Sequence, residues 1–102
     1  MDKKPGPKSR AAFHDEQAVV APGQQRIALL SELALASGRG ATVTDLDGNT
    51  YLDFFAGVAV ASLGHAHPGY IAAVEAQLRR ISVGSFTTEN RLRLLKLIAK
   101  LA

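Results

Sequence analysis

The sequence contains neither cysteine nor tryptophan among its 102 residues. The absence of cysteine excludes disulfide bonds, thiolate catalysis and cysteine metal sites. No apolar run reaches the length of about 18 residues that a membrane-spanning helix needs, so no such helix is expected. The basic N-terminus has no apolar segment behind it and does not resemble a secretory signal. A cytoplasmic location is therefore the default expectation.

The charge of the chain is concentrated at its N-terminus. The formal net charge is +3, and the first ten residues hold four of the 12 Lys and Arg residues but one of the 9 Asp and Glu residues. The rest of the chain therefore holds eight charges of each sign. Nucleic-acid binding needs a basic stripe on a folded face, with interleaved aromatic residues for single strands. The sequence has no such stripe, so we expect neither nucleic acid nor a membrane as a partner.

The first forty residues predict an arm, then a helix and a strand. Residues 1–23 form a basic arm, whose first half has too little apolar content to order itself. In residues 24–37 the apolar side chains first recur at helical spacing and then alternate over residues 33–36, which favours a strand there. The Gly-Arg-Gly sequence at residues 38–40 predicts a flexible corner.

The strongest local signal in the chain predicts a β-hairpin. Residues 41–45 contain two threonines around a valine, which favours a strand. Asp47, Gly48 and Asn49 tolerate the positive φ of a tight turn, and residues 50–55 then return as the second strand. Because a two-stranded hairpin alone is marginally stable, we expect residues 33–36 to add a third strand, or a helix to cover the pair.

Residues 57–64 (GVAVASLG) form an uncharged segment of small and apolar residues. One interpretation is a buried connector whose small side chains let neighbouring backbone approach closely. The other is a backbone that lines a cleft and presents Val58 to a ligand. The composition alone favours the connector.

Two amphipathic helices are expected after this segment. Pro68 fits the first helical position, and apolar residues then recur every three or four positions until Gly84, which would end the helix. The second helix begins near Thr88 and reaches Ala102 without a Gly, Asn or Pro to end it, so we expect the chain to be a fragment. The apolar stripes consist of Ile71, Val74, Leu78 and Ile81 in the first helix, and Leu92, Leu95, Ile98 and Ala99 in the second.

The residues alone predict no catalytic, cofactor-binding or metal site. His65 and His67 stand two positions apart, and a structural zinc site would need two further ligands. We expect instead that their imidazoles bond to backbone groups near the start of a helix. The glycine spacing matches neither a dinucleotide fingerprint nor a phosphate-binding loop. No lysine stands where burial would activate it to form an imine.

The sequence between Asp45 and Gln77 resembles the N-terminal signature of class III pyridoxal-phosphate aminotransferases, which are fold type I enzymes. The pattern is an acid, Asp-Gly, an aromatic residue, Leu-Asp-Phe, Gly-Val-Ala-Val, Gly-His-x-His-Pro and a helix carrying a glutamine. Many positions agree in order and spacing, and the similarity extends over residues 38–102. The upstream segment AVVAPGQQR is similar to the 4-aminobutyrate branch. The matching residues are Asp45, Asp47, Gly48, Tyr51, Leu52, Asp53, Phe54, Gly57, Val58, Ala59, Val60, Gly64, His65, His67, Pro68 and Gln77.

The resemblance implies an α/β enzyme much longer than this chain. Within it, this chain would be an α+β portion: a short three-stranded antiparallel sheet followed by two amphipathic helices. Residues 24–86 would belong to the small domain, and residues 87–102 would lead into the large cofactor domain. The resemblance also implies a homodimer and pyridoxal 5'-phosphate as cofactor, with the imine-forming lysine beyond Ala102.

Two substrate-binding residues follow from the resemblance. Val58 matches a position that lines the substrate pocket, and Phe86 matches an aromatic position near the active site of a partner subunit. The implied reaction moves an amino group from an ω-amine, with 4-aminobutyrate expected first, to 2-oxoglutarate. An acetylornithine or ornithine donor is the alternative, as is a non-catalytic truncated or interaction module. The fragment alone is expected to be inactive.

Overall fold

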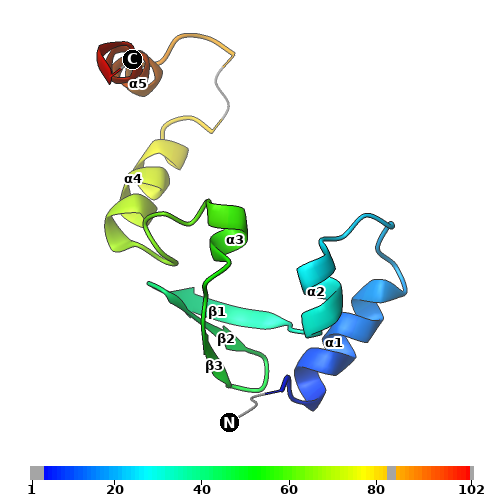
Figure 1. The fold of residues 1–102 in the computed structure, drawn as a ribbon. Helices are drawn as coiled ribbons and strands as arrows, with labels where there is room; N and C mark the ends of the chain where they lie inside the picture. Colours follow the sequence, from blue (N-terminus) through cyan, green and yellow to red (C-terminus); the bar gives the residue numbers. More distant parts are fainter. Residues whose placement is uncertain (1–3, 83–84, 102) are drawn as a thin grey trace. The chain divides into compact units, whose positions relative to one another are not determined.

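A computed structural model describes residues 4–82 and 85–101 of the chain (Figure 1). The chain divides into two compact units, Met1–His67 and Pro68–Ala102. The first unit contains a small sheet with two helices before it and a short turn after it, and the second contains two helices. The domain boundaries expected after residues 23 and 86 concern a larger enzyme and stay predictions.

The sheet has three antiparallel strands in the order β1-β2-β3. They are β1 (Leu35–Arg39), β2 (Thr42–Asp45) and β3 (Thr50–Leu52). Val43 of the central strand pairs with Tyr51 and is 7% exposed, which makes it the buried apolar side chain of the described residues. The predicted three-stranded sheet is therefore confirmed, but its apolar core is very small.

The hairpin between β2 and β3 is organised around the buried carboxylate of Asp45. This carboxylate accepts hydrogen bonds from the backbone N–H groups of Asp47 (3.0 Å) and Asn49 (2.8 Å). It also accepts bonds from the Asn49 amide (3.0 Å) and the Tyr51 hydroxyl (2.9 Å). Burial opposes the charge, but the bonds from Asn49 and Tyr51 keep the pKa of Asp45 below its usual range. Gly48 supplies the positive φ of 84° that the tight turn requires.

The expectation of an unstructured arm is wrong for part of the N-terminus, because Pro7–Gln17 form the helix α1. The carboxylate of Asp47, in the hairpin turn, accepts hydrogen bonds from the backbone N–H groups of Lys8 (3.0 Å) and Ser9 (2.8 Å). These groups lie in the first turn of α1, where backbone donors have no partner within the helix. The hairpin therefore caps the helix from almost forty residues away, which local composition could not reveal.

The helix-then-strand expectation for residues 24–37 is confirmed in order but shifted in position. Arg26–Ser31 form α2, and Glu32 ends it with a left-handed φ of 53°. The strand β1 begins at Leu35 and continues through Gly38, which was expected to belong to a flexible corner. A side chain at position 38 would stand 2.8 Å from Cγ of His65, so glycine is needed there for close packing.

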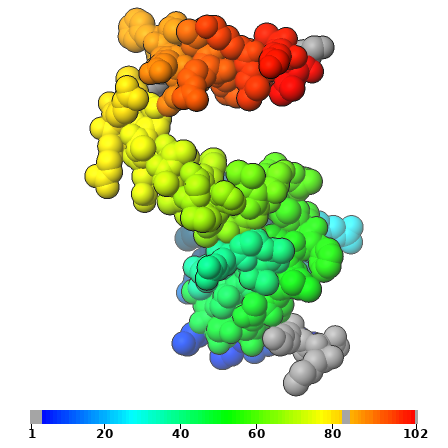
Figure 2. All heavy atoms as spheres, turned by 90° about the vertical axis from the view of Figure 1, so that its left-hand side faces the viewer, coloured from blue at the N-terminus to red at the C-terminus, as the bar shows by residue number. Residues whose placement is uncertain are grey.

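The second unit contains the two expected helices, α4 (Pro68–Leu78) and α5 (Glu89–Leu101). Thr88 caps α5 by accepting a 3.2 Å bond from the backbone N–H of Arg91. The stop predicted at Gly84 lies outside the described residues. The large apolar side chains of both helices are exposed in this chain. Figure 2 shows α5 in orange to red.

Candidate functional site

The segment Ala56–Ala59, labelled α3, is a single turn of left-handed helix. The backbone N–H groups of Val58 and Ala59 both donate to the carbonyl of Phe55, at 3.0 Å, and so close the turn. A left-handed turn costs about 1–2 kcal/mol for each residue with a side chain, and a β-branched residue is a clear outlier there. The φ angles are 49° at Ala56, 60° at Gly57, 68° at Val58 and 61° at Ala59.

The carboxylate of Asp53 holds the start of this turn. Its Oδ1 accepts hydrogen bonds from the backbone N–H groups of Phe55 (2.9 Å) and Ala56 (2.8 Å). Its Oδ2 lies 2.6 Å from Nε2 of His65. The bond to His65 holds the pKa of Asp53 below its usual range, and the N–H of Ala56 acts in the same direction.

Residues 53–65 form a closed loop, which we call the 53–65 loop. Besides the side-chain pair at its base, the backbone of His65 exchanges two hydrogen bonds with Gly40, of 2.9 and 2.8 Å. The backbone N–H of Asp53 donates to the carbonyl of Ala41 at 2.9 Å. Both ends of the loop are thus attached to the corner between β1 and β2. A hollow of about 190 Å³ lies at this base, lined by Gly40, Ala41, Asp53, Ala56, Ala61, Ser62, Gly64 and His65.

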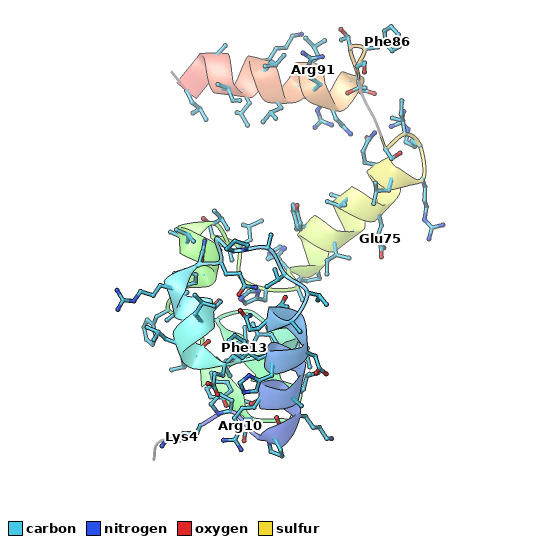
Figure 3. The ribbon with its side chains drawn as sticks, turned by 90° about the vertical axis from the view of Figure 1, so that its right-hand side faces the viewer. Lys4, Arg10, Phe13, Glu75, Phe86 and Arg91 are labelled. Carbon is cyan, nitrogen blue, oxygen red and sulfur yellow. The ribbon has the colours of Figure 1, made fainter. Side chains whose placement is uncertain are left out.

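The two sequence-predicted site residues lie in different units. Val58 lies in the left-handed turn and is 56% exposed. Phe86 lies in the link before α5, is 84% exposed and projects from the chain in Figure 3. The unit that contains each residue therefore leaves its side chain exposed to a partner or ligand. The expectation that residues 57–64 form a buried connector does not hold in this chain.

The role expected for His65 is also wrong. Its imidazole contacts the carboxylate of Asp53 instead of a backbone group. The sequence signal that could have revealed this pair is the absence of charge between the two residues. Asp53 and His65 flank eleven uncharged positions, and a polar pair at the ends of such a segment can close it into a compact loop.

The geometry of the site suits binding of a ligand. The Asp53 carboxylate is occupied by two backbone donors and an imidazole, so it orders the backbone and is not directed at a ligand. All the described lysines, namely Lys4, Lys8, Lys96 and Lys100, are exposed. What the loop offers to a ligand is its apolar left-handed turn.

A family comparison covers most of the chain. The family described as Aminotransferase class-III matches residues 23–102. Among the described residues, the helices are too short or too polar to cross a membrane.

Individual relatives and solved structures agree with this family. The chain is 57% identical over 47 residues to the acetylornithine aminotransferase of Corynebacterium efficiens, covering 46% of this chain and 12% of the relative. It is 43% identical over 72 residues to that of Methanothermobacter thermautotrophicus, covering 69% and 18%. The crystal structure of an omega-transaminase from Sphaerobacter thermophilus matches with a TM-score of 0.79 at 29% identity, over 94% of this chain and 23% of the other. The chain thus spans less than a quarter of the length of each of these three proteins.

Proposed function

The chain belongs to the class III aminotransferase family, and we propose that it forms the substrate-side N-terminal part of an acetylornithine or ornithine aminotransferase. The observation that carries this proposal is the family match over residues 23–102. The donor is supported by the relatives, which are 57% and 43% identical over their matched segments and are both acetylornithine aminotransferases. They favour the alternative donor over the 4-aminobutyrate that the sequence suggested first, with 2-oxoglutarate as the proposed acceptor.

The family uses pyridoxal phosphate, which supplies the electron sink for amino transfer when it is bound. The described residues do not fit such a site on their own. An imine-forming lysine is activated by desolvation, whereas every described lysine is exposed. We therefore propose that the remainder of the enzyme supplies the cofactor site, and that this chain alone does not transaminate.

Within this enzyme we propose that Val58 forms part of the wall of the substrate pocket. Its support is its exposure and its place in a strained turn, because residues held in rare backbone conformations cluster at functional sites. For Phe86, which is 84% exposed, we propose a place beside the active site of a second subunit in a homodimer. The cytoplasmic location stays a prediction.

Two chimeric enzymes test the donor. Residues 23–102 replace the matching segment of the Methanothermobacter acetylornithine aminotransferase in one chimera, and that of a 4-aminobutyrate aminotransferase in the other. We expect the acetylornithine chimera to keep kcat/KM within about tenfold of its parent, and the second chimera to lose about a hundredfold, because a mismatched pocket wall weakens transition-state binding.

Controls separate the donor from the family assignment. The unaltered parents and the 102-residue chain alone are assayed in parallel, and the chain alone is expected to give neither transamination nor an imine absorbance band. A smaller loss in the 4-aminobutyrate chimera would overturn the donor proposal. Inactivity of both chimeras in folded, cofactor-loaded form would overturn the proposed function itself.

A further inference from the structure

The 53–65 loop is held closed by contacts that do not involve its tip. At its base the Asp53 carboxylate lies 2.6 Å from the His65 imidazole, and Asp53 N–H and the backbone of His65 are bonded to the β1–β2 corner. Compact loops whose ends are joined in this way are frequently functional. The tip carries the left-handed turn and Val58.

The turn needs external support because its own backbone is strained. Ala56, Val58 and Ala59 all have a positive φ, at about 1–2 kcal/mol for each residue. Strained conformations persist where the surrounding structure over-determines them. In the described structure that support comes from Asp53, whose Oδ1 binds two successive backbone N–H groups at the start of the turn.

His65 fixes the orientation of that carboxylate. Its ring engages Oδ2, so Oδ1 is left facing the turn. The ring itself is confined on one side by Gly38, because a Cβ there would stand 2.8 Å from its Cγ, and its backbone is bonded to Gly40. The imidazole is 31% exposed and the carboxylate 14%, so the pair is partly shielded from water.

We infer that Asp53 and His65 are positioning residues for substrate recognition: together they hold the left-handed turn that presents Val58 to the amino donor. This inference rests on the proposed function for the donor, but the conformational part stands on its own contacts. Neither residue needs to touch the substrate, because each acts through the backbone of Ala56–Ala59.

Nuclear magnetic resonance on the 102-residue chain tests the conformational part. A positive φ gives a strong intraresidue cross-peak between the amide and α protons, and we expect it at Val58 in the unsubstituted chain. Asp53→Ala and His65→Ala should weaken this cross-peak several-fold. His65→Gln should retain it, because the glutamine amide can still donate to Oδ2 of Asp53. Asp15→Asn and His14→Ala, on the exposed side of α1, are matched controls that should leave it unchanged.

Kinetics in the acetylornithine chimera test the recognition part. We expect Asp53→Ala and His65→Ala to raise KM for the amino donor about tenfold while kcat changes less than about threefold, with rescue by His65→Gln. A general loss of folding would instead lower the yield of active enzyme without this split. Equal losses in kcat and kcat/KM, or no change, would overturn the inference.

The two experiments fail independently. If the cross-peak is absent from the unsubstituted chain, or persists in both alanine variants, the inference is wrong whatever the chimera does. If the chimera is inactive before any substitution, the proposed function is wrong. The cross-peaks then still decide whether Asp53 and His65 hold the turn.

Discussion

Val58 has a β-branched side chain on a left-handed backbone, with φ 68° and ψ 51°. Its neighbour Gly57 has a similar conformation, φ 60° and ψ 39°, without the steric cost. The difference between the two residues shows which part of the turn is permissive and which part is strained. A side chain added at Gly57 should therefore destabilise the turn.

Replacing Gly57 by alanine should destabilise the acetylornithine chimera by about 1 kcal/mol, because alanine disfavours positive φ. The added Cβ would also stand 3.1 Å from Cγ2 of Val60. Gly69→Ala, in the first turn of α4, is the matched control and should stabilise by about 0.5–1 kcal/mol. Thermal unfolding measures both variants, and destabilisation of equal size at the two positions would contradict the left-handed geometry.

Three carboxylates make the first unit sensitive to acid. The pKa of Asp53 is lowered mainly by His65, while those of Asp45 and Asp47 are lowered by backbone and side-chain donors that outweigh burial. A lowered folded-state pKa stabilises the fold fully above the unfolded value of about 3.9. This stabilisation is lost as the pH falls through the lowered folded-state values.

We therefore expect the amide resonances of the hairpin and of the 53–65 loop to keep their dispersion down to about pH 4 and to lose it below that. A titration of the 102-residue chain by NMR measures this. Asp45→Asn should already weaken the hairpin at neutral pH, because an amide group cannot accept bonds with both of its polar atoms. Loss of dispersion between about pH 5 and 7 would contradict the prediction, because a group other than these carboxylates would then control the stability.

At the scale of the elements, α1 depends on the hairpin through one side chain. Asp47 binds the N–H groups of Lys8 and Ser9, and Gly6 approaches so closely that a Cβ there would clash with the side chain of Asp47. We predict that Gly6→Ala displaces this carboxylate and detaches α1. Hydrogen exchange at Lys8 and Ser9 should rise about tenfold. Gly69→Ala, in the first turn of α4 and outside the first unit, is the control, and similar exchange in both variants would contradict the prediction.

Local sequence patterns predicted most of the helices and strands but not the hydrogen bonds that connect distant segments. The turn at Gly48 and the helix start at Pro68 could be predicted because their residues set the backbone directly. The left-handed turn could not, since alanine and valine favour other conformations and the support comes from Asp53. Helix α1 could not either, because its cap lies in the hairpin. Val58 was proposed from a family resemblance, and its role stays a prediction.

At the scale of the whole molecule, the chain has far more apolar surface than core. Val43 is the buried apolar side chain of the described residues, whereas twenty-five large hydrophobic side chains among them are exposed. An exposed apolar surface of this extent marks an interaction site or a liability for aggregation. It agrees with a chain that spans 12–18% of its relatives.

We predict that the isolated chain binds a hydrophobic dye through the exposed apolar side chains of α5. Leu97→Ala should change its stability by less than about 0.5 kcal/mol, because Leu97 is 54% exposed there. In the chimera the same change should cost about 2–5 kcal/mol if the rest of the enzyme covers α5. Lys96→Ala is the control and should cost little in both. A sharp, dye-free transition of the isolated chain would show that the chain closes its own core.

The docking of α1 has a further consequence, for how the polypeptide ages. Asp47 and Gly48 form an Asp-Gly sequence, in which the glycine nitrogen can attack the aspartate side-chain carboxyl carbon and expel water to give a succinimide, whose hydrolysis then gives isoaspartate. In the docked state both Asp47 oxygens are bound by Lys8 and Ser9, and the Gly48 N–H donates to the Asp45 carbonyl at 3.1 Å. Detachment of α1 would free both Asp47 oxygens, so we expect isoaspartate to form faster at Asp47 in a chain whose first helix is detached.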